Sequence, residues 1–226
     1  MLEGGTMEDL FRSQTGKRAN YKKGELILRS NEDTEDFFVI ERGLVTVYGI
    51  SNIGEKYIHI VYGEREVFPL RWLVDSTSLN LYYEAGTDCT VMRYNKKRFL
   101  ETLHVDASVG FAMLLQVVRQ FSVYIARVDN LEYKFAQERI AYRLLLLAKR
   151  FGTRKKGSSG YIELPVVSQE EIGSAINLSR EGVSRGLRRF KKLGYIMYSD
   201  RKLVILNREG LRKELGNSER TLFIDE

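Results

Sequence analysis

Two short helices separated by a three-residue turn are predicted near the C-terminal end of the chain, and this pattern restricts the fold more than any other. Residues 168–171, Ser-Gln-Glu-Glu, form a capping box, in which a serine hydroxyl and a glutamate carboxylate bond free amides at a helix start. Apolar residues follow at helical spacing to residue 176. Ser179 can cap a second helix, whose buried face would be Val183, Leu187 and Phe190. The pattern therefore predicts a helix-turn-helix.

The opposite face of the second helix is polar and strongly charged. An α-helix fits the major groove of duplex DNA, where arginine can donate two hydrogen bonds to guanine and a carboxylate can accept one from cytosine. Glu181 is informative because phosphates would repel it, so we interpret it as a base contact; the alternative is an ion pair with Arg185 one turn away. The residues expected to contact bases are Arg180, Glu181, Ser184 and Arg185.

A hairpin is predicted after this helix, because residues 194–196 and 202–205 alternate around a Ser-Asp-Arg turn. The excess positive charge also lies here: residues 150–226 carry 16 Lys and Arg against 10 Asp and Glu, whereas residues 1–149 carry 20 of each. This asymmetry predicts a polyanionic partner, the alternative being a solvated basic surface. The residues expected to contact phosphates are Ser168, Gln169, Ser179, Arg188, Arg201 and Lys202.

Short β-strands separated by glycines are predicted for most of the first hundred residues. Such strands favour an antiparallel β-barrel or jelly roll, which together with the helices makes the chain an α+β protein. A helix over 139–150 and a strand over 161–167 are expected before the capping box. The predicted strands of the barrel are 26–28, 37–40, 44–48, 57–61, 82–84 and 90–94.

One long helix, beginning near residue 106, carries a narrow apolar stripe at alternating steps of three and four residues. Such a stripe favours a parallel coiled coil with a second copy; the alternative is packing on the chain's own barrel. Gln116, Gln120 and Arg127 lie beside the stripe, as residues flanking a dimer interface would. The residues of the predicted dimer interface are Leu114, Val117, Phe121, Tyr124, Val128 and Leu131.

Residues 169–196, QEEIGSAINLSREGVSRGLRRFKKLGYI, closely resemble the winged helix of the Crp/Fnr family of bacterial transcription regulators. Residues 139–148 resemble the first helix of that family's DNA-binding domain, and residues 21–27 and 38–45 resemble its cyclic-nucleotide-binding barrel. The resemblance implies a homodimer of three parts. These are an effector-sensing β-barrel domain (1–105), a dimerisation helix and hinge (106–135), and a winged helix-turn-helix domain (136–226).

The resemblance also implies which DNA is bound. In this family, Arg, Glu and Arg matching Arg180, Glu181 and Arg185 contact half-sites resembling TGTGA. The Fnr branch uses Glu, Ser and Arg, matching Glu181, Ser184 and Arg185, on half-sites resembling TTGAT. The chain carries both sets, so palindromic double-stranded DNA with a shared GA core is expected, the outer bases staying open. A dimer would contact two half-sites about one helical turn apart, and RNA polymerase is expected as a further partner.

The chain departs from the family at the ligand cassette. Cyclic-nucleotide binders carry Phe-Gly-Glu-Leu for the ribose and Arg-Ser/Thr-Ala for the phosphate. Here residues 67–72 are Val-Phe-Pro-Leu-Arg-Trp and residues 79–81 are Leu-Asn-Leu, so the glutamate and the arginine are missing. Their charge-assisted bonds are worth roughly several kcal/mol, which argues against cAMP or cGMP as the ligand. Arg71 could replace the arginine only from a different part of the cassette.

The chain offers few ligands for a metal-containing effector. An iron–sulfur cluster needs four cysteines, whereas Cys89 is the single one and is better interpreted as a buried structural thiol than as a redox sensor. Haem needs an axial ligand, and His59 in a predicted strand is a poor candidate. No cofactor is expected. The candidate effector site is an aromatic cluster suited to an apolar or aromatic molecule, unless these residues form core: Phe68, Arg71, Trp72, Tyr82, Tyr83 and Tyr124.

The sequence thus predicts a DNA-binding regulator and not an enzyme. A jelly-roll metalloenzyme would need a histidine cluster, and the chain has only two histidines, His59 and His104. An architectural DNA protein would bind scrambled sites equally well. The longest aliphatic run, residues 144–148, is far shorter than the roughly 20 residues of a spanning helix, so a cytoplasmic protein without a membrane partner is expected. Control by an effector that shifts the long helix and constitutive DNA binding both stay open.

Overall fold

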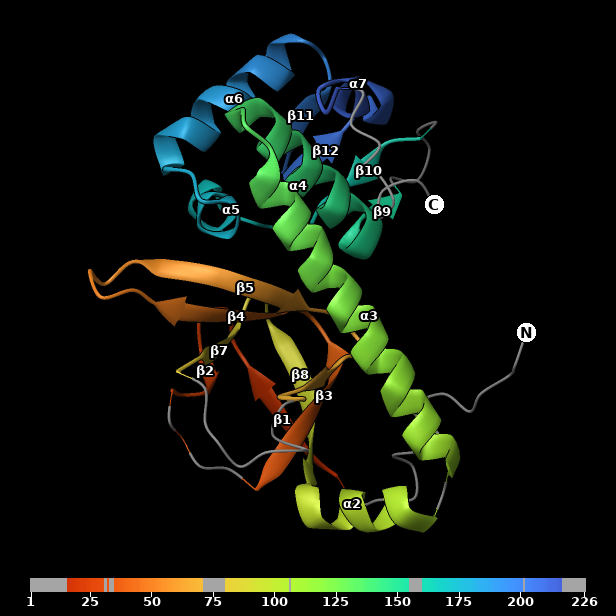
Figure 1. The fold of residues 1–226 in the computed structure, drawn as a ribbon. Helices are drawn as coiled ribbons and strands as arrows, with labels where there is room; N and C mark the ends of the chain where they lie inside the picture. Colours follow the sequence, from red (N-terminus) through yellow and green to blue (C-terminus); the bar gives the residue numbers. More distant parts are fainter. Residues whose placement is uncertain are drawn as a thin grey trace. The chain divides into compact units, whose positions relative to one another are not determined.

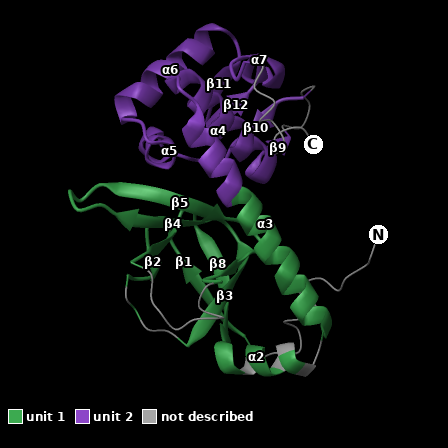
Figure 2. Cartoon of the chain, viewed as in Figure 1, with its two compact units in different colours: residues 1–123 green, residues 124–226 purple. Residues whose placement is uncertain are grey.

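The computed structural model describes residues 16–30, 32, 35–70, 80–105, 107–154, 160–200 and 202–216. The chain divides into two compact units, residues 1–123 and 124–226 (Figure 2). The division falls inside the long helix α3, Ala107–Glu132, which therefore contributes to both units.

The first unit is built on two four-stranded antiparallel sheets, with strand orders β1-β8-β3-β6 and β2-β7-β4-β5 (Figure 1). Residues from both sheets meet in one apolar core that includes Phe38, Val47, Ile60, Phe68 and Val91. The strands are β1 (Lys17–Tyr21), β2 (Leu26–Leu28), β3 (Asp36–Arg42), β4 (Val45–Ile50), β5 (Lys56–Tyr62), β6 (Val67–Phe68), β7 (Tyr82–Ala85) and β8 (Cys89–Asn95). The predicted jelly-roll type of architecture is confirmed, with β1 and β6 added to the strands expected from the sequence.

A second core lies on the other face of the first sheet. Side chains alternate along a strand, so Phe37 points away from the core that contains Phe38 and instead contacts Phe99, with ring centroids 4.6 Å apart. Phe99 belongs to α2, Lys96–Val105, a helix that the sequence pattern did not indicate, and Val109 and Met113 of α3 complete this cluster. Helix α3 is thereby seated on the barrel.

The buried face of α3 is polar at three positions: Gln116, Gln120 and Asn130 are only 3–4% exposed. The Gln120 side-chain amide donates to the Val67 carbonyl over 3.0 Å, which explains why a polar residue is tolerated there. Gln116 and Gln120 were expected beside a dimer interface, and instead they face their own protomer. An apolar stripe in the sequence does not reveal which polar neighbours the chain buries against itself.

The predicted stripe of α3 is exposed. Its members are between 37% and 63% exposed: Leu114, Val117, Phe121, Tyr124, Val128 and Leu131. In the described part of the chain, α3 is the one helix that is long and apolar enough to cross a membrane. Length and composition alone do not make a spanning segment, and the bond from Gln120 to β6 commits one side of this helix to the barrel.

The second unit combines four helices with a small sheet of strand order β11-β12-β10-β9. Its helices are α4 (Ala136–Phe151), α5 (Gln169–Ile176), α6 (Arg180–Lys192) and α7 (Arg208–Lys213). Its strands are β9 (Thr153–Arg154), β10 (Ile162–Glu163), β11 (Ile196–Ser199) and β12 (Lys202–Ile205). The strand predicted over 161–167 is shorter than expected: Ile162 and Glu163 pair with β9 and β12, and the Leu164 amide adds one bond to the Leu203 carbonyl of β12.

Candidate nucleic-acid interface

The capping box at the start of α5 forms as predicted. The Ser168 hydroxyl accepts a hydrogen bond from the Glu171 amide over 3.0 Å, and the Glu171 carboxylate accepts one from the Ser168 amide over 2.6 Å. Two amides that a helix start leaves without partners are satisfied reciprocally. The beginning of the first helix is thus fixed by residues local in sequence.

The turn between the helices closes through backbone contacts. Asn177 takes a left-handed conformation, with φ at 58°, and the Leu178 amide donates to the Gly173 carbonyl over 3.0 Å. A Cβ atom at position 173 would lie 2.4 Å from the Leu178 carbonyl oxygen. Gly173 is therefore needed for this close approach, and the turn sets the direction in which the second helix leaves.

Helix α6 begins at a capped end and is held by an apolar side. The Ser179 hydroxyl accepts from the Gly182 amide over 3.1 Å. Val183, Leu187 and Phe190 are at most 2% exposed, as the sequence predicted. A Cβ atom at Gly186 would lie 2.4 Å from the Ile140 side chain, so α6 and α4 pack closely at this point.

The other side of α6 faces solvent. Arg180, Glu181, Arg185 and Arg188 are exposed, and Ser184 is half-buried. None of these four charged side chains has a hydrogen bond or ion pair with a residue that the structure describes. In particular, Glu181 and Arg185 do not form the ion pair that their spacing allows. The helix thus presents three guanidinium groups and one carboxylate that intramolecular contacts leave available.

The predicted wing is confirmed as a hairpin. Strands β11 and β12 pair antiparallel from Ile196 and Ile205 to Ser199 and Lys202, and Asp200 at the turn has φ at 50°. Lys202, expected to contact phosphate, forms an ion pair with Glu163 of β10. Arg201 lies outside the described residues.

Two arginines of this unit have roles that sequence reasoning missed. Arg139 of α4 donates to the Ile176 carbonyl over 3.2 Å and so caps the end of α5. Arg189 of α6 pairs with Glu214 at 2.6 Å, directing its charge toward the segment after α7. Both contacts join residues at least 25 positions apart, so no local pattern indicates them.

Within the first unit, Phe68, Tyr82 and Tyr83 of the predicted effector cluster do not form one group. Phe68 is fully buried and stacks with Phe38, Tyr62 and Tyr83 at centroid distances of 5.3, 5.9 and 5.4 Å. Tyr82 points to the opposite face of β7 and stacks with Tyr48 at 5.2 Å. Tyr124 belongs to α3, and Arg71 and Trp72 lie outside the described residues.

The outer face of β7 holds a further charged contact. Glu84 accepts two bonds of 3.0 Å from the Lys56 ammonium, which lies 3.7 Å from the centre of the Tyr48 ring. Burial, reinforced by the nearby Glu84 carboxylate, raises the pKa of Tyr48 to about 12. The charge of Lys56 is balanced by Glu84 within this cluster, so the cluster offers a ligand no unpaired cation.

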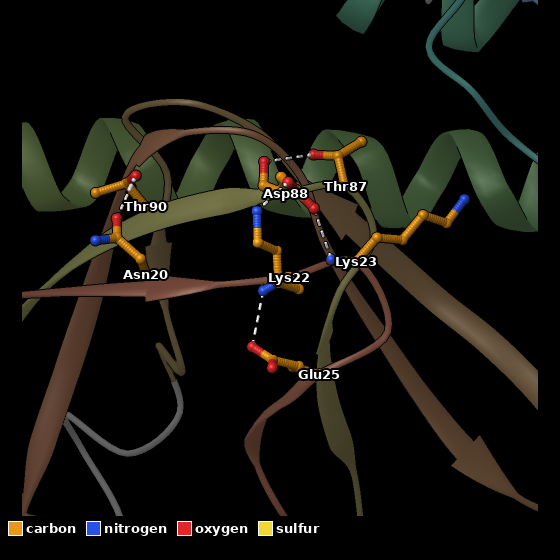
Figure 3. A network of polar contacts seen from close by, with 7 residues as sticks. All are labelled: Asn20, Lys22, Lys23, Glu25, Thr87, Asp88 and Thr90. Atoms are coloured by element: carbon orange, nitrogen blue, oxygen red, sulfur yellow. Dashed lines mark hydrogen bonds and ion pairs between the residues drawn. The ribbon is translucent and has the colours of Figure 1, made fainter.

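The turns next to these strands are closed by a polar network (Figure 3). The Asp88 carboxylate accepts from the Lys23 amide over 3.0 Å and from the Lys22 ammonium over 2.9 Å. These two bonds, the backbone one foremost, lower the pKa of Asp88. Glu25 accepts from the Lys22 amide over 2.7 Å. Because Lys22 and Lys23 both bond to Asp88, the network fixes the β1–β2 turn against the turn before β8.

Metal ligands do not cluster in the described part of the chain, where no group of three or more His, Cys, Asp or Glu side chains could hold an ion. Cys89 is buried at 4% exposed. Burial, with a smaller contribution from the Asp88 charge, raises the pKa of its thiol to about 11.

Both units of the chain match models of known protein families. Residues 18–106 match the model of the cyclic nucleotide-binding domain, and residues 138–214 match that of the Crp-like helix-turn-helix domain. The cAMP-activated global transcriptional regulator CRP of Escherichia coli is 23% identical over 82% of this chain and 87% of that protein. The transcriptional activator protein anr of Pseudomonas aeruginosa is 26% identical over 82% of this chain and 75% of that protein. The structure of FixK2 from Bradyrhizobium japonicum superposes with a TM-score of 0.74 at 24% identity, covering 88% and 96% of the chains.

Proposed function

Because the chain belongs to the Crp/Fnr family of DNA-binding transcription regulators, we propose that it binds a palindromic DNA site as a homodimer. The observation that carries the proposal is the solvent face of α6. Arg180, Arg185, Arg188 and Glu181 have no hydrogen bond or ion pair with the described residues. The helix itself is fixed by a cap, a turn and a packed apolar side. Rigid presentation of unpaired donors and an acceptor is what base recognition requires.

Roles in DNA binding follow from chemistry. Arg180 and Arg185 would donate to guanine, Glu181 would accept from cytosine, and Ser184 would contact an adjacent base. Ser168, Gln169, Ser179 and Arg188 would contact phosphates, with Arg201 at the wing. Lys202 can join them only by leaving Glu163. We therefore expect Lys202 to add less to affinity than Arg188.

The dimer is supported by the apolar side of α3. Six large apolar residues along one stripe are 37–63% exposed in the protomer, and such surface is stabilised by a second copy of the same helix. A two-fold dimer would place two α6 helices on half-sites about one helical turn apart. We expect half-sites resembling TGTGA or TTGAT, action on RNA polymerase, and a cytoplasmic location.

We assign residues 1–105 to effector sensing, 106–135 to dimerisation and hinge, and 136–226 to DNA binding. The effector would be a small molecule other than cAMP. The stack of Phe38, Tyr62, Phe68 and Tyr83 inside the barrel favours a second candidate as well: a regulator that binds DNA constitutively and whose barrel is structural.

Selection of bound duplexes from a random pool tests the proposal, with and without metabolites from a cell extract. The expected result is enrichment of a two-fold symmetric motif with half-sites about one helical turn apart. R185A should relax preference at one base pair per half-site, costing about 1–3 kcal/mol. Recovery of random sequence, or no binding with either preparation, would refute the proposed function.

A further inference from the structure

The exposed stripe of α3 has the spacing of a coiled-coil heptad. If Leu114, Phe121 and Val128 are the first core positions of three heptads, then Val117, Tyr124 and Leu131 are the second ones. The two flanking positions of each heptad then follow from the numbering. The flanking residues just before the first core positions are Met113, Gln120 and Arg127. The flanking residues just after the second core positions are Val118, Ile125 and Glu132.

Only the last heptad has charges at its flanking positions. Met113 and Gln120 are buried against their own barrel, at 7% and 4% exposed, so they are not available to a second copy. Arg127 is half-buried, and its Nε atom is buried without a hydrogen-bond partner among the residues described. Glu132 is exposed and forms no ion pair with them. One cation and one anion that flank the stripe thus have no ion-pair partner among the residues that the structure describes.

Arg127 lies close enough to a second buried cation, Arg143, to affect its pKa. Arg143 of α4 is buried at its Nε atom, which also lacks a partner in the described part of the chain. Burial first, and then the positive charges of Arg150 and Arg127, lower the pKa of Arg143 to about 10. Burial also lowers the pKa of Arg127. The Glu171 carboxylate partly offsets the shift at Arg143, whereas no carboxylate of a described residue acts on Arg127. A half-buried cation without a carboxylate is costly, so a carboxylate brought to Arg127 from outside would be favoured.

We propose that Arg127 of each copy forms an ion pair with Glu132 of a second copy in a parallel dimer of α3. In a parallel coiled coil, the residue just before a first core position on one helix faces a residue of the other helix whose number is five higher. That second residue directly follows a second core position. Position 127 therefore lies opposite position 132, and the two-fold axis makes the pair twice. The inference rests on the proposed dimer and adds what sets its direction and register.

These two pairs would oppose other arrangements of the same stripe. In an antiparallel dimer, Arg127 would instead face the same flanking position of the second helix, where Met113 and Gln120 are uncharged. The apolar stripe alone tolerates both directions, because both bury the same side chains. Charged flanking residues distinguish them, and they would hold the two α6 helices on the same side of the dimer.

Charge reversal tests the proposal on the full-length chain. R127E and E132R should each raise the dissociation constant of the homodimer about ten-fold, because each replaces two attractions with two repulsions. An equimolar mixture of R127E and E132R should form heterodimers as stable as the unsubstituted dimer, since both cross-pairs are then attractive. The double variant R127E/E132R should also recover. Sedimentation equilibrium gives the constants, and native mass spectrometry gives the heterodimer fraction.

Matched controls reverse charges elsewhere: R119E on the exposed side of α3 and E101R on α2 should leave the dissociation constant within about two-fold. Circular dichroism verifies that each variant is folded. Unchanged constants for R127E and E132R, or a statistical mixture of dimers, would overturn the ion pair and leave the dimer intact. An unsubstituted chain that stays monomeric, or associates with lipid vesicles through α3, would overturn the proposed dimer itself.

Discussion

Replacing Gly173 with alanine should destabilise the helix-turn-helix, whereas the same replacement at Gly182 should stabilise it. Both glycines lie within helices, so alanine gains up to about 1 kcal/mol of helix propensity at either site. The sites differ in what the new methyl group meets. At Gly182 the nearest atom is the Ser179 hydroxyl oxygen at 3.5 Å, an ordinary contact; at Gly173 it is the Leu178 carbonyl oxygen at 2.4 Å.

The magnitude follows from these distances. The Leu178 carbonyl must retreat by roughly 1 Å, which costs about 1–3 kcal/mol as overpacking. The retreat also weakens the bond from the Leu178 amide to the Gly173 carbonyl, worth about 1 kcal/mol. After subtracting the gain in propensity, G173A should lose about 1–3 kcal/mol of stability. G182A should gain about 0.4–1 kcal/mol.

Hydrogen exchange followed by mass spectrometry measures both changes at the helices concerned. For α5 and α6, G173A should accelerate exchange by about 5- to 150-fold, and G182A should slow it by about 2- to 5-fold. Peptides from β3 and β8 in the other unit serve as the internal reference. Exchange in G173A as slow as in the unsubstituted chain would refute the argument that this turn requires glycine.

Further perturbations test other parts of the structure. S168A should cost about 1 kcal/mol at the start of α5, seen as faster exchange of its first amides; equal exchange would contradict the cap. G43A should destabilise the barrel by about 2 kcal/mol, because Gly43 has φ at 94° and its Cβ would lie 2.6 Å from the Asp88 carbonyl oxygen; an unchanged urea midpoint for the first unit would exclude this. Cys89 has a pKa raised from 9.0 to about 11, so the folded state holds a proton that the unfolded state releases, and stability should fall as pH rises from about 9 to 11. C89A should lose that part of the pH dependence; identical slopes with and without the thiol would show that Cys89 does not contribute.

The helix-turn-helix could be predicted almost residue by residue because its determinants are local. The capping box, the left-handed asparagine and the serine cap each join residues at most four positions apart. The hairpin after α6 is equally local. Alternation and glycine spacing predicted six of the barrel strands, with boundaries that differ from the structure by at most two residues.

Other features depend on contacts between distant segments. Helix α2 forms because Phe99 packs on Phe37, and β6 is only two residues long, paired with β3. The burial of Gln120 depends on a carbonyl 53 positions away. No pattern within a window of the sequence contains this information.

The effector cluster had a local signal that was overlooked. Tyr82 and Tyr83 are neighbours in a strand, so their side chains must point to opposite faces. Only Tyr83 can share the interior with Phe68. Alternation alone therefore separates the two tyrosines, whereas proximity in the sequence suggested that they act together.

The central claim is that the solvent face of α6 recognises bases, and binding of E181A to every single base-pair variant of the selected site tests it most directly. We predict that E181A binds the selected site about 1–3 kcal/mol more weakly and loses its preference at one base pair in each half-site, while preferences elsewhere are kept. A uniform change in affinity across all variants, with the preference at every position intact, would contradict the account.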